Sequence, residues 1–248
     1  PFADADRPVS HRVLKYLQFF NPNDSIDYAL VSHFHNDHYG EVLENTPFSQ
    51  RGDYQLTGIT AIGDAMPFKN LIDRAFPNYN FPYDLRKPNG REDRTMINYL
   101  KFIIYHQQHS NMRVAQLNPG SDDQISLRHD PSSHPLFRVR NVKVNGYFWT
   151  GKGDGAGAFP FAPPLVDGKG YYNENPLSLA LKISYGLFDY YVGGDIPGVD
   201  DYPDYDMETP MANIVGNIEA LTLNHHGYKD ATNNGFLAGL KPQVIAHQ

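Results

Sequence analysis

The chain has 248 residues, of which 40% are hydrophobic, a formal net charge of −7 at pH 7 and no cysteine. The missing cysteines exclude disulfides, thiolate metal ligands and cysteine nucleophiles, and the acidic balance argues against a protein that coats nucleic acid. No apolar run approaches the roughly 18 residues of a membrane span and no signal segment opens the chain, so the sequence predicts a soluble globular protein of undefined oligomeric state.

Strand-like and helix-like segments alternate along the chain, which is the pattern of an α/β protein. In the first half we expect a helix over 11–20 capped by Ser10, a strand over 25–32, helical segments at 39–45 and 64–76, a loop or insertion at 77–94, and a helix over 95–109 with Ile97, Leu100, Ile103 and Ile104 on its core face. In the second half we expect strands at 113–119, 124–129 and 136–151, a hairpin of 177–185 and 188–195, loops at 151–164 and 200–210, a strand over 217–227, a helix over 233–240 and a final strand over 243–247. Residues 1–248 are expected to form a single domain.

The segment VSHFHNDHYG, residues 31–40, places His33, His35, Asp37 and His38 directly after an apolar run. Imidazoles and carboxylates are the natural ligands of zinc and similar divalent metals where thiolates are absent. One turn can direct the first two histidines to one ion, and the aspartate and third histidine to a second. The alternative is a histidine-rich surface loop that binds no metal.

Two later strands also end in groups that can bind metal. The run YYVGGD presents Asp195 after a pair of glycines, and LTLNHHG ends in His225 and His226. Because all three motifs follow the carboxyl ends of strands, one sheet could gather them. The simpler alternatives are that the aspartate caps a helix and that one of the paired histidines only packs the turn.

These motifs resemble the metallo-β-lactamase fold of hydrolases, through SHFHNDHYGE, NPLSLALKISYGLFDYYVGGD and NHHGYKDATNNGFLAGLKPQVIA. Within that fold the chain is most similar to the hydrolase domain of ComEC-type DNA-uptake competence proteins and to phosphorylcholine-esterase-like enzymes. The resemblance covers essentially the whole chain and implies an α/β fold, a metallo-β-lactamase-like αββα sandwich. It implies one or two zinc ions, with manganese as an alternative, bound by His33, His35, Asp37, His38, Asp195 and His225.

The chain departs from the family pattern in two places. An early aspartate is matched by Asp4 in ADAD, with Asp6 where glycine is usual, so the family's first strands would lie upstream of residue 1 and the domain is expected to lack one or two N-terminal strands. The family's further histidine between the first motif and the bridging aspartate is also missing. Asn145 stands at the end of the corresponding strand, and none of the remaining histidines, such as His134, has a matching context. The first metal site is therefore expected to be weak, vacant or completed by water.

The resemblance implies hydrolysis by a water molecule that a bound metal ion activates, with a phosphodiester of a small molecule or a nucleic acid as the leading substrate. Asp37 would orient the water, and His226 would contact a phosphate or assist the leaving group. The alternatives are a carboxylic ester, lactone or β-lactam hydrolase, or a metal-binding module without catalysis. The cations of LRKPNGREDR could attract an anionic substrate, or this could be a solvated charged loop. The absence of cysteine leans toward an exported, periplasmic or cell-surface bacterial protein, but it identifies no compartment.

Overall fold

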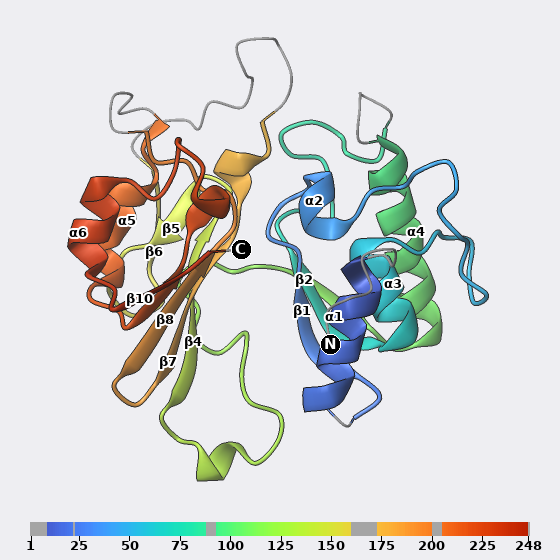
Figure 1. Cartoon of the computed structure of the whole chain (residues 1–248), viewed down its shortest axis with the longest axis horizontal. Helices are drawn as coiled ribbons and strands as arrows, with labels where there is room; N and C mark the ends of the chain where they lie inside the picture. Colours follow the sequence, from blue (N-terminus) through green and yellow to red (C-terminus); the bar gives the residue numbers. More distant parts are fainter. Residues whose placement is uncertain (1–8, 22, 88–92, 160–172, 200–204, 248) are drawn as a thin grey trace. The chain divides into compact units, whose positions relative to one another are not determined.

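A computed structural model describes residues 9–21, 23–87, 93–159, 173–199 and 205–247. The chain divides into two compact units, residues 1–116 and residues 117–248. Each unit has its own β-sheet, its own helices and its own hydrophobic core, and Figure 1 shows the elements of both.

The first unit is built on a parallel three-stranded sheet in the order β1-β2-β3. Its elements are α1 (Val9–Phe20), β1 (Ile26–Leu30), α2 (Asn36–Tyr39), α3 (Gly58–Ala65), β2 (Phe68–Asp73), α4 (Asp93–His109) and β3 (Arg113–Gln116). Parallel strands need crossover connections, and α3 and α4 lie on the two crossovers of this sheet. Figure 1 shows α1, α3 and α4 on the same side of the sheet.

Aromatic side chains dominate the core of the first unit. Tyr99 and Phe102 of α4 and Leu71 of β2 are completely buried, and Phe34 from the loop after β1 joins the same cluster. Burial of each such side chain stabilises the fold by about 1.5–3 kcal/mol. The loop that carries the first candidate ligands is thus anchored in the core of its unit.

The second unit is built on a mixed seven-stranded sheet in the order β10-β9-β8-β7-β4-β5-β6. Its elements are β4 (Phe137–Val144), β5 (Tyr147–Trp149), β6 (Ala156–Ala158), β7 (Ala180–Tyr185), β8 (Phe188–Gly193), α5 (Glu208–Val215), β9 (Ala220–Thr222), α6 (Asn234–Leu240) and β10 (Val244–Ala246), with short 3-10 turns at Pro131–Ser133, Asn175–Leu177 and Asn224–Gly227. Strands β8, β9 and β10 are parallel, and the other neighbouring pairs are antiparallel. Helices α5 and α6 pack on each other and supply the core residues Met211 and Phe236.

The pairing of β8 with β9 places two of the predicted motifs at one edge of this sheet. The strands are parallel, with Tyr190 opposite Ala220 and Tyr191 opposite Leu221. Because parallel strands present their carboxyl ends at the same edge, the segment after β8 and the segment after β9 emerge side by side. Asp195 stands on the first segment, and the paired histidines stand on the second.

Three local predictions are wrong. The segment 64–76 contains the strand β2, because the short run FKNLID satisfies the spacing of a helix face and of a buried strand equally well. The predicted helical segment at 39–45 does not form. The single helical turn α2 ends at Tyr39, before Gly40, whose φ is 109°. Residues 124–129 form no strand, and the helices α3 and α5 were not predicted.

The predicted α/β class is confirmed. Each unit supplies one sheet and one set of helices, which are the layers that an αββα sandwich requires. Residues 77–87 form neither helix nor strand, as expected of the predicted loop, and α4 begins at Asp93. The single domain of residues 1–248 stays a prediction.

Candidate metal centre

Two aromatic anchors hold the loop that carries the first group of candidate ligands. Phe34 and Tyr39 are 2% and 1% exposed, and the centres of their rings are 5.7 Å apart. Tyr99 of α4 contacts both rings, and the Arg74 guanidinium lies 4.7 Å from the centre of the Phe34 ring. Because Phe34 stands between two of the histidines in the sequence, its burial fixes the backbone from which both imidazoles project.

The ligand atoms of this loop form two pairs. Nε2 of His33 and Nδ1 of His35 are 3.1 Å apart, and Nε2 of His38 and Oδ2 of Asp37 are 3.8 Å apart. Two nitrogens that bind one tetrahedral zinc ion, each at about 2.0–2.1 Å, stand roughly 3.3 Å apart. The first pair therefore already has the spacing of two ligands on a common ion. The pairs are those expected from the sequence, and metal binding by them stays a prediction.

Ser32 orients two of these imidazoles and was not among the predicted residues. Its hydroxyl oxygen is 3.2 Å from Nδ1 of His33 and 3.3 Å from Nδ1 of His38. A hydroxyl oxygen has two acceptor lone pairs, so it can accept a hydrogen bond from the Nδ1–H group of both rings, which leaves the lone pair of each ring on Nε2. The Nε2 atoms are then the ones that enter the two ligand pairs.

Asp195 lies between the two candidate histidines of the second unit. Its backbone N–H donates to the Ser178 hydroxyl at 3.0 Å, which fixes the residue just beyond the end of β8. Nε2 of His225 is 3.7 Å from Oδ2 of this aspartate, and Nε2 of His226 is 3.6 Å from Oδ1. Both distances exceed a hydrogen bond and approach the roughly 3.3 Å between two ligands of one ion. Oδ2 can thus share a cation with His225, the predicted ligand, while Oδ1 lies beside His226.

The paired histidines have an uncommon backbone conformation. His225 has φ 46° and ψ 44°, and His226 has φ 53° and ψ 23°. Residues other than glycine rarely adopt this left-handed region, at a cost on the order of 1–3 kcal/mol each, and such residues cluster at functional sites. This turn brings two consecutive imidazoles to opposite oxygens of one carboxylate.

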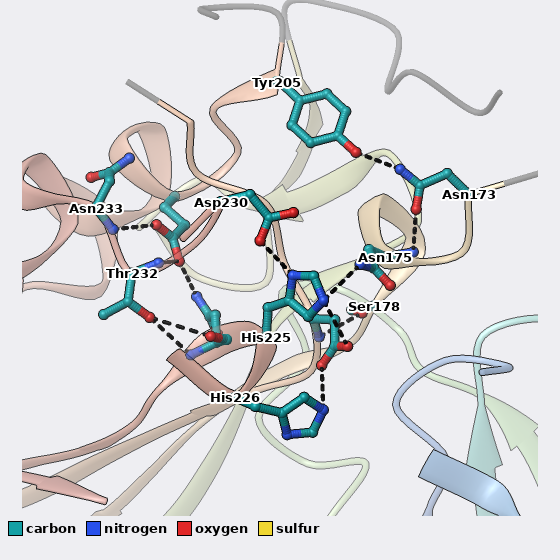
Figure 2. A network of polar contacts seen from close by, with 12 residues as sticks. Asn173, Asn175, Ser178, Tyr205, His225, His226, Asp230, Thr232 and Asn233 are labelled. Atoms are coloured by element: carbon teal, nitrogen blue, oxygen red, sulfur yellow. Dashed lines mark hydrogen bonds and ion pairs between the residues drawn. The ribbon is translucent and has the colours of Figure 1, made fainter. Parts of the chain in front are cut away.

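Asp230 orients the His225 ring and was also missed by the sequence reasoning. One carboxylate oxygen of Asp230 lies 2.5 Å from Nδ1 of His225 (Figure 2). An ionised carboxylate only accepts hydrogen bonds, so Nδ1 carries the proton and Nε2 presents its lone pair toward Asp195. Metal-binding histidines commonly have such a carboxylate on the other ring nitrogen. The spacing HHGYKD gives no signal for this contact, because the loop has to fold back on itself to make it.

We expect Asp230→Asn to weaken divalent metal binding about 10- to 100-fold. The amide carries no charge, and its N–H group can stabilise the tautomer in which Nδ1 is the acceptor. The dissociation constant is measured by competition with a chromophoric chelator, and Asp154→Asn, a change at an exposed carboxylate of the same unit, is the matched control. Equal affinities for wild type and Asp230→Asn would contradict the assigned orientation.

Glu208 closes the histidine loop at both of its ends. Its carboxylate is completely buried and accepts hydrogen bonds from Asn224 Nδ2 at 2.6 Å, from the Thr232 backbone at 2.6 Å and from the Asn233 backbone at 2.8 Å. The backbone N–H of Asn224 also donates to the Thr232 hydroxyl at 3.1 Å. Since these residues flank the paired histidines, the clamp holds the strained turn in one conformation.

Two glycines make room for this clamp. A Cβ atom at Gly198 would lie 1.9 Å from the Glu208 carboxylate, and a Cβ atom at Gly193 would lie 2.2 Å from the Asn224 side-chain oxygen. The first glycine of the GGD motif is therefore explained by close packing against the histidine loop.

Burial raises the pKa of Glu208 to about 7, above its ordinary value of 4.5. Between about pH 4.5 and pH 7 the unfolded chain loses this proton before the folded chain does, so the free energy of unfolding falls as the pH rises through this window. Glu208→Gln removes this titrating group and with it the pH dependence of the unfolding free energy that Glu208 causes. We expect urea unfolding with chelator present to show a smaller loss of stability between about pH 5 and pH 7.5 in the variant than in wild type. Identical losses would show that Glu208 does not titrate in this range.

Asn145 and His134 lie at opposite ends of β4. The Asn145 backbone N–H donates to the Leu177 carbonyl at 3.2 Å, close to the segment that contacts Asp195. His134 precedes β4 and its Nδ1 is 3.2 Å from the Tyr185 hydroxyl, at the far end of β7. A strand rises about 3.3 Å per residue, so the length of β4 separates His134 from the edge that carries the aspartate. His134 is not the missing ligand.

The predicted cationic loop is partly neutralised. Arg86 donates to Asp84 at 2.7 Å and holds the pKa of that carboxyl well below its usual range, and Lys87 lies 3.4 Å from the same residue. This pairing supports the solvated charged loop over a site for anions. Three residues named from the sequence lie outside the described residues: Asp4, Asp6 and Arg91.

Comparisons with known proteins add little to this geometry. The sequence matches no family model and no curated protein. Among solved structures it is similar to the CmlA beta-hydroxylase E377D mutant, with a TM-score of 0.41 and 11% identity over 92% of this chain. The match spans 37% of that protein's length, and a similarity of this size assigns neither a family nor an activity. In the described part of the chain, every helix is too short or too polar to cross a membrane.

Proposed function

We propose that the chain is a metal-dependent hydrolase with a metallo-β-lactamase-like fold that binds one or two divalent ions. The observation that carries the proposal is the arrangement around Asp195, whose two oxygens each face the Nε2 atom of a different histidine. A carboxylate placed in this way can bridge two cations. In the first unit, the His33 and His35 pair, with its spacing of 3.1 Å, offers two nitrogens with the spacing of ligands on one cation.

The donor chemistry fits zinc or manganese. The candidate ligands are imidazole nitrogens and carboxylate oxygens, and the chain has no thiolate. The oriented rings support a cation site, since Ser32 and Asp230 engage Nδ1 of three imidazoles and leave Nε2 as the inward nitrogen. A merely solvated histidine loop has no need of such orientation.

The proposed roles follow from this arrangement. Metal ligands are His33, His35, Asp37, His38, Asp195 and His225. A bound divalent cation would lower the pKa of water toward neutrality and polarise the substrate oxygen. Asp37, whose side chain is 66% exposed, would orient the attacking water. His226 is 38% exposed and His225 is 21% exposed, which favours His226 as the group that faces the substrate.

The substrate class we propose is a phosphodiester, as in the ComEC-type and phosphorylcholine-esterase-like enzymes that the sequence resembles. The imidazole of His226 would donate a hydrogen bond to a phosphate oxygen as negative charge builds up on it. The same proton could then pass to the leaving alkoxide.

Hydrolysis of model substrates by the metal-loaded protein tests this proposal. We expect cleavage of bis(p-nitrophenyl) phosphate that chelator abolishes and added Zn²⁺ or Mn²⁺ restores, with one to two ions bound per chain. Cleavage of nitrocefin or a lactone without phosphodiesterase activity would replace the proposed substrate by an ester or β-lactam. Less than one ion per chain after mild purification would support a module without catalysis.

A further inference from the structure

Asn175 lies beside the His225 imidazole in the second unit (Figure 2). It begins a 3-10 turn, and its backbone N–H donates to the Asn173 side-chain oxygen at 3.2 Å. Its Nδ2 atom is 3.3 Å from Nε2 of His225, the nitrogen that faces Asp195. The residue is 8% exposed, so it is a buried amide at the edge of the candidate metal centre.

The hydrogen bonds of this amide do not balance without a cation. Among the described residues, Oδ1 of Asn175 is buried and has no hydrogen-bond partner, which is unfavourable for a polar atom. Rotating the amide by 180° would turn Oδ1 toward Nε2 of His225. That nitrogen also presents a lone pair, because Nδ1 of the same ring donates to Asp230. In the orientation of the structure the buried Oδ1 has no partner among the described residues, and after rotation Oδ1 and Nε2 face each other as two acceptors that a cation could bind together.

We propose that the Asn175 side-chain oxygen is a further ligand of the ion held by Asp195 and His225. The proposal rests on the proposed function and supplies the ligand that the sequence lacks at the end of β4. The turn after β4 packs against the Asn175 segment, since Asn145 donates to the Leu177 carbonyl. The amide thus enters the site from the neighbouring segment, close to the position where a histidine was expected.

The chemistry of an amide ligand sets the metal preference. A side-chain carbonyl oxygen is neutral and harder than an imidazole, and oxygen ligands favour Mn²⁺ relative to a site completed by nitrogen. Asn175 should therefore strengthen Mn²⁺ binding, and replacing its oxygen should change the ligand field of the bound ion.

Metal affinity in variants of the full chain tests the proposal. Dissociation constants for Mn²⁺ and Zn²⁺ are measured by chelator competition, and the visible spectrum of the Co²⁺-loaded protein reports the ligand set. We expect Asn175→Ala to weaken Mn²⁺ binding more than about 10-fold and to alter the Co²⁺ spectrum. We expect Asn175→Asp, which keeps an oxygen at this position and adds a charge, to bind Mn²⁺ at least as tightly as wild type. The matched control is Asn213→Ala, an exposed asparagine of α5 in the same unit.

The outcomes separate this inference from the proposed function. If wild type binds ions and Asn175→Ala binds them equally well, the amide is not a ligand and the proposed function stands. If both Asn175 variants lose affinity and also melt at lower temperature with chelator present, the residue is structural and the inference is overturned. If wild type binds no divalent ion, the proposed function fails and the inference fails with it.

Discussion

Replacing Asp195 by asparagine is expected to lower turnover of bis(p-nitrophenyl) phosphate by at least about 10³-fold while the protein remains folded. Each oxygen of this carboxylate faces Nε2 of a different imidazole, at 3.7 Å and 3.6 Å. Either oxygen is therefore placed to bind a cation. Asparagine offers one neutral oxygen and an N–H group that repels a cation. His35→Ala should have a comparable effect, because it removes one nitrogen of the pair spaced at 3.1 Å and leaves the Phe34 anchor in place.

Two control variants make these losses interpretable. Asp189→Asn changes an aspartate of strand β8 that pairs with Lys182 at 2.8 Å, and His109→Ala changes an exposed histidine of α4. Both should keep activity within about twofold of wild type, since neither residue is a candidate ligand or one of the residues that orient the ligands. Wild-type turnover in Asp195→Asn and His35→Ala, with ions still bound, would show that neither residue belongs to the catalytic centre.

Replacing Lys143 by methionine is expected to lower the free energy of unfolding by about 3–5 kcal/mol. The lysine is completely buried in β4, and its ammonium donates to the backbone carbonyls of Asn145, Pro176 and Ser178 at 3.0, 2.7 and 2.9 Å. Methionine fills a similar volume but leaves these buried acceptors without that donor. Urea denaturation of the metal-free protein measures the change.

The same lysine links stability to the candidate centre. Pro176 lies within the turn Asn175–Leu177 and Ser178 follows it, and the Ser178 hydroxyl accepts a hydrogen bond from the Asp195 backbone. Lys143→Met should therefore also weaken metal binding, whereas Lys152→Met at an exposed position should change neither quantity. A loss of stability below about 1 kcal/mol in Lys143→Met would mean that the three carbonyls find other partners.

The α/β class was predictable because long apolar and turn-rich segments alternate, but boundaries depended on contacts between distant residues. The run FKNLID shows the difficulty, since only pairing with β1 and β3 makes it a strand. Helix α4 was predicted at its position, yet it buries Tyr99 and Phe102 while Ile97 and Ile104 are 37% and 55% exposed. Hydrophobicity alone predicts that isoleucine side chains are buried in the core. In this helix the aromatic rings of Tyr99 and Phe102 are the completely buried side chains, and Ile97 and Ile104 remain exposed.

The candidate ligands were predictable because imidazoles and carboxylates after strand ends are a chemical signal in the sequence itself. The groups that orient them were not, because a contact such as Asp230 to His225 depends on how a loop folds back. Glu208 is a further example, since a glutamate in a run read as loop became the buried first residue of α5. Residues that position the candidate ligands cannot be told apart from other polar residues in the sequence, because their contacts depend on the folded structure.

The most direct test of the metal centre at Asp195 is anomalous diffraction from crystals of the protein loaded with Zn²⁺ or Mn²⁺. We predict an ion within about 2.0–2.3 Å of an Asp195 carboxylate oxygen and of Nε2 of His225. Ions bound elsewhere, with Asp195 outside their coordination, would contradict this prediction.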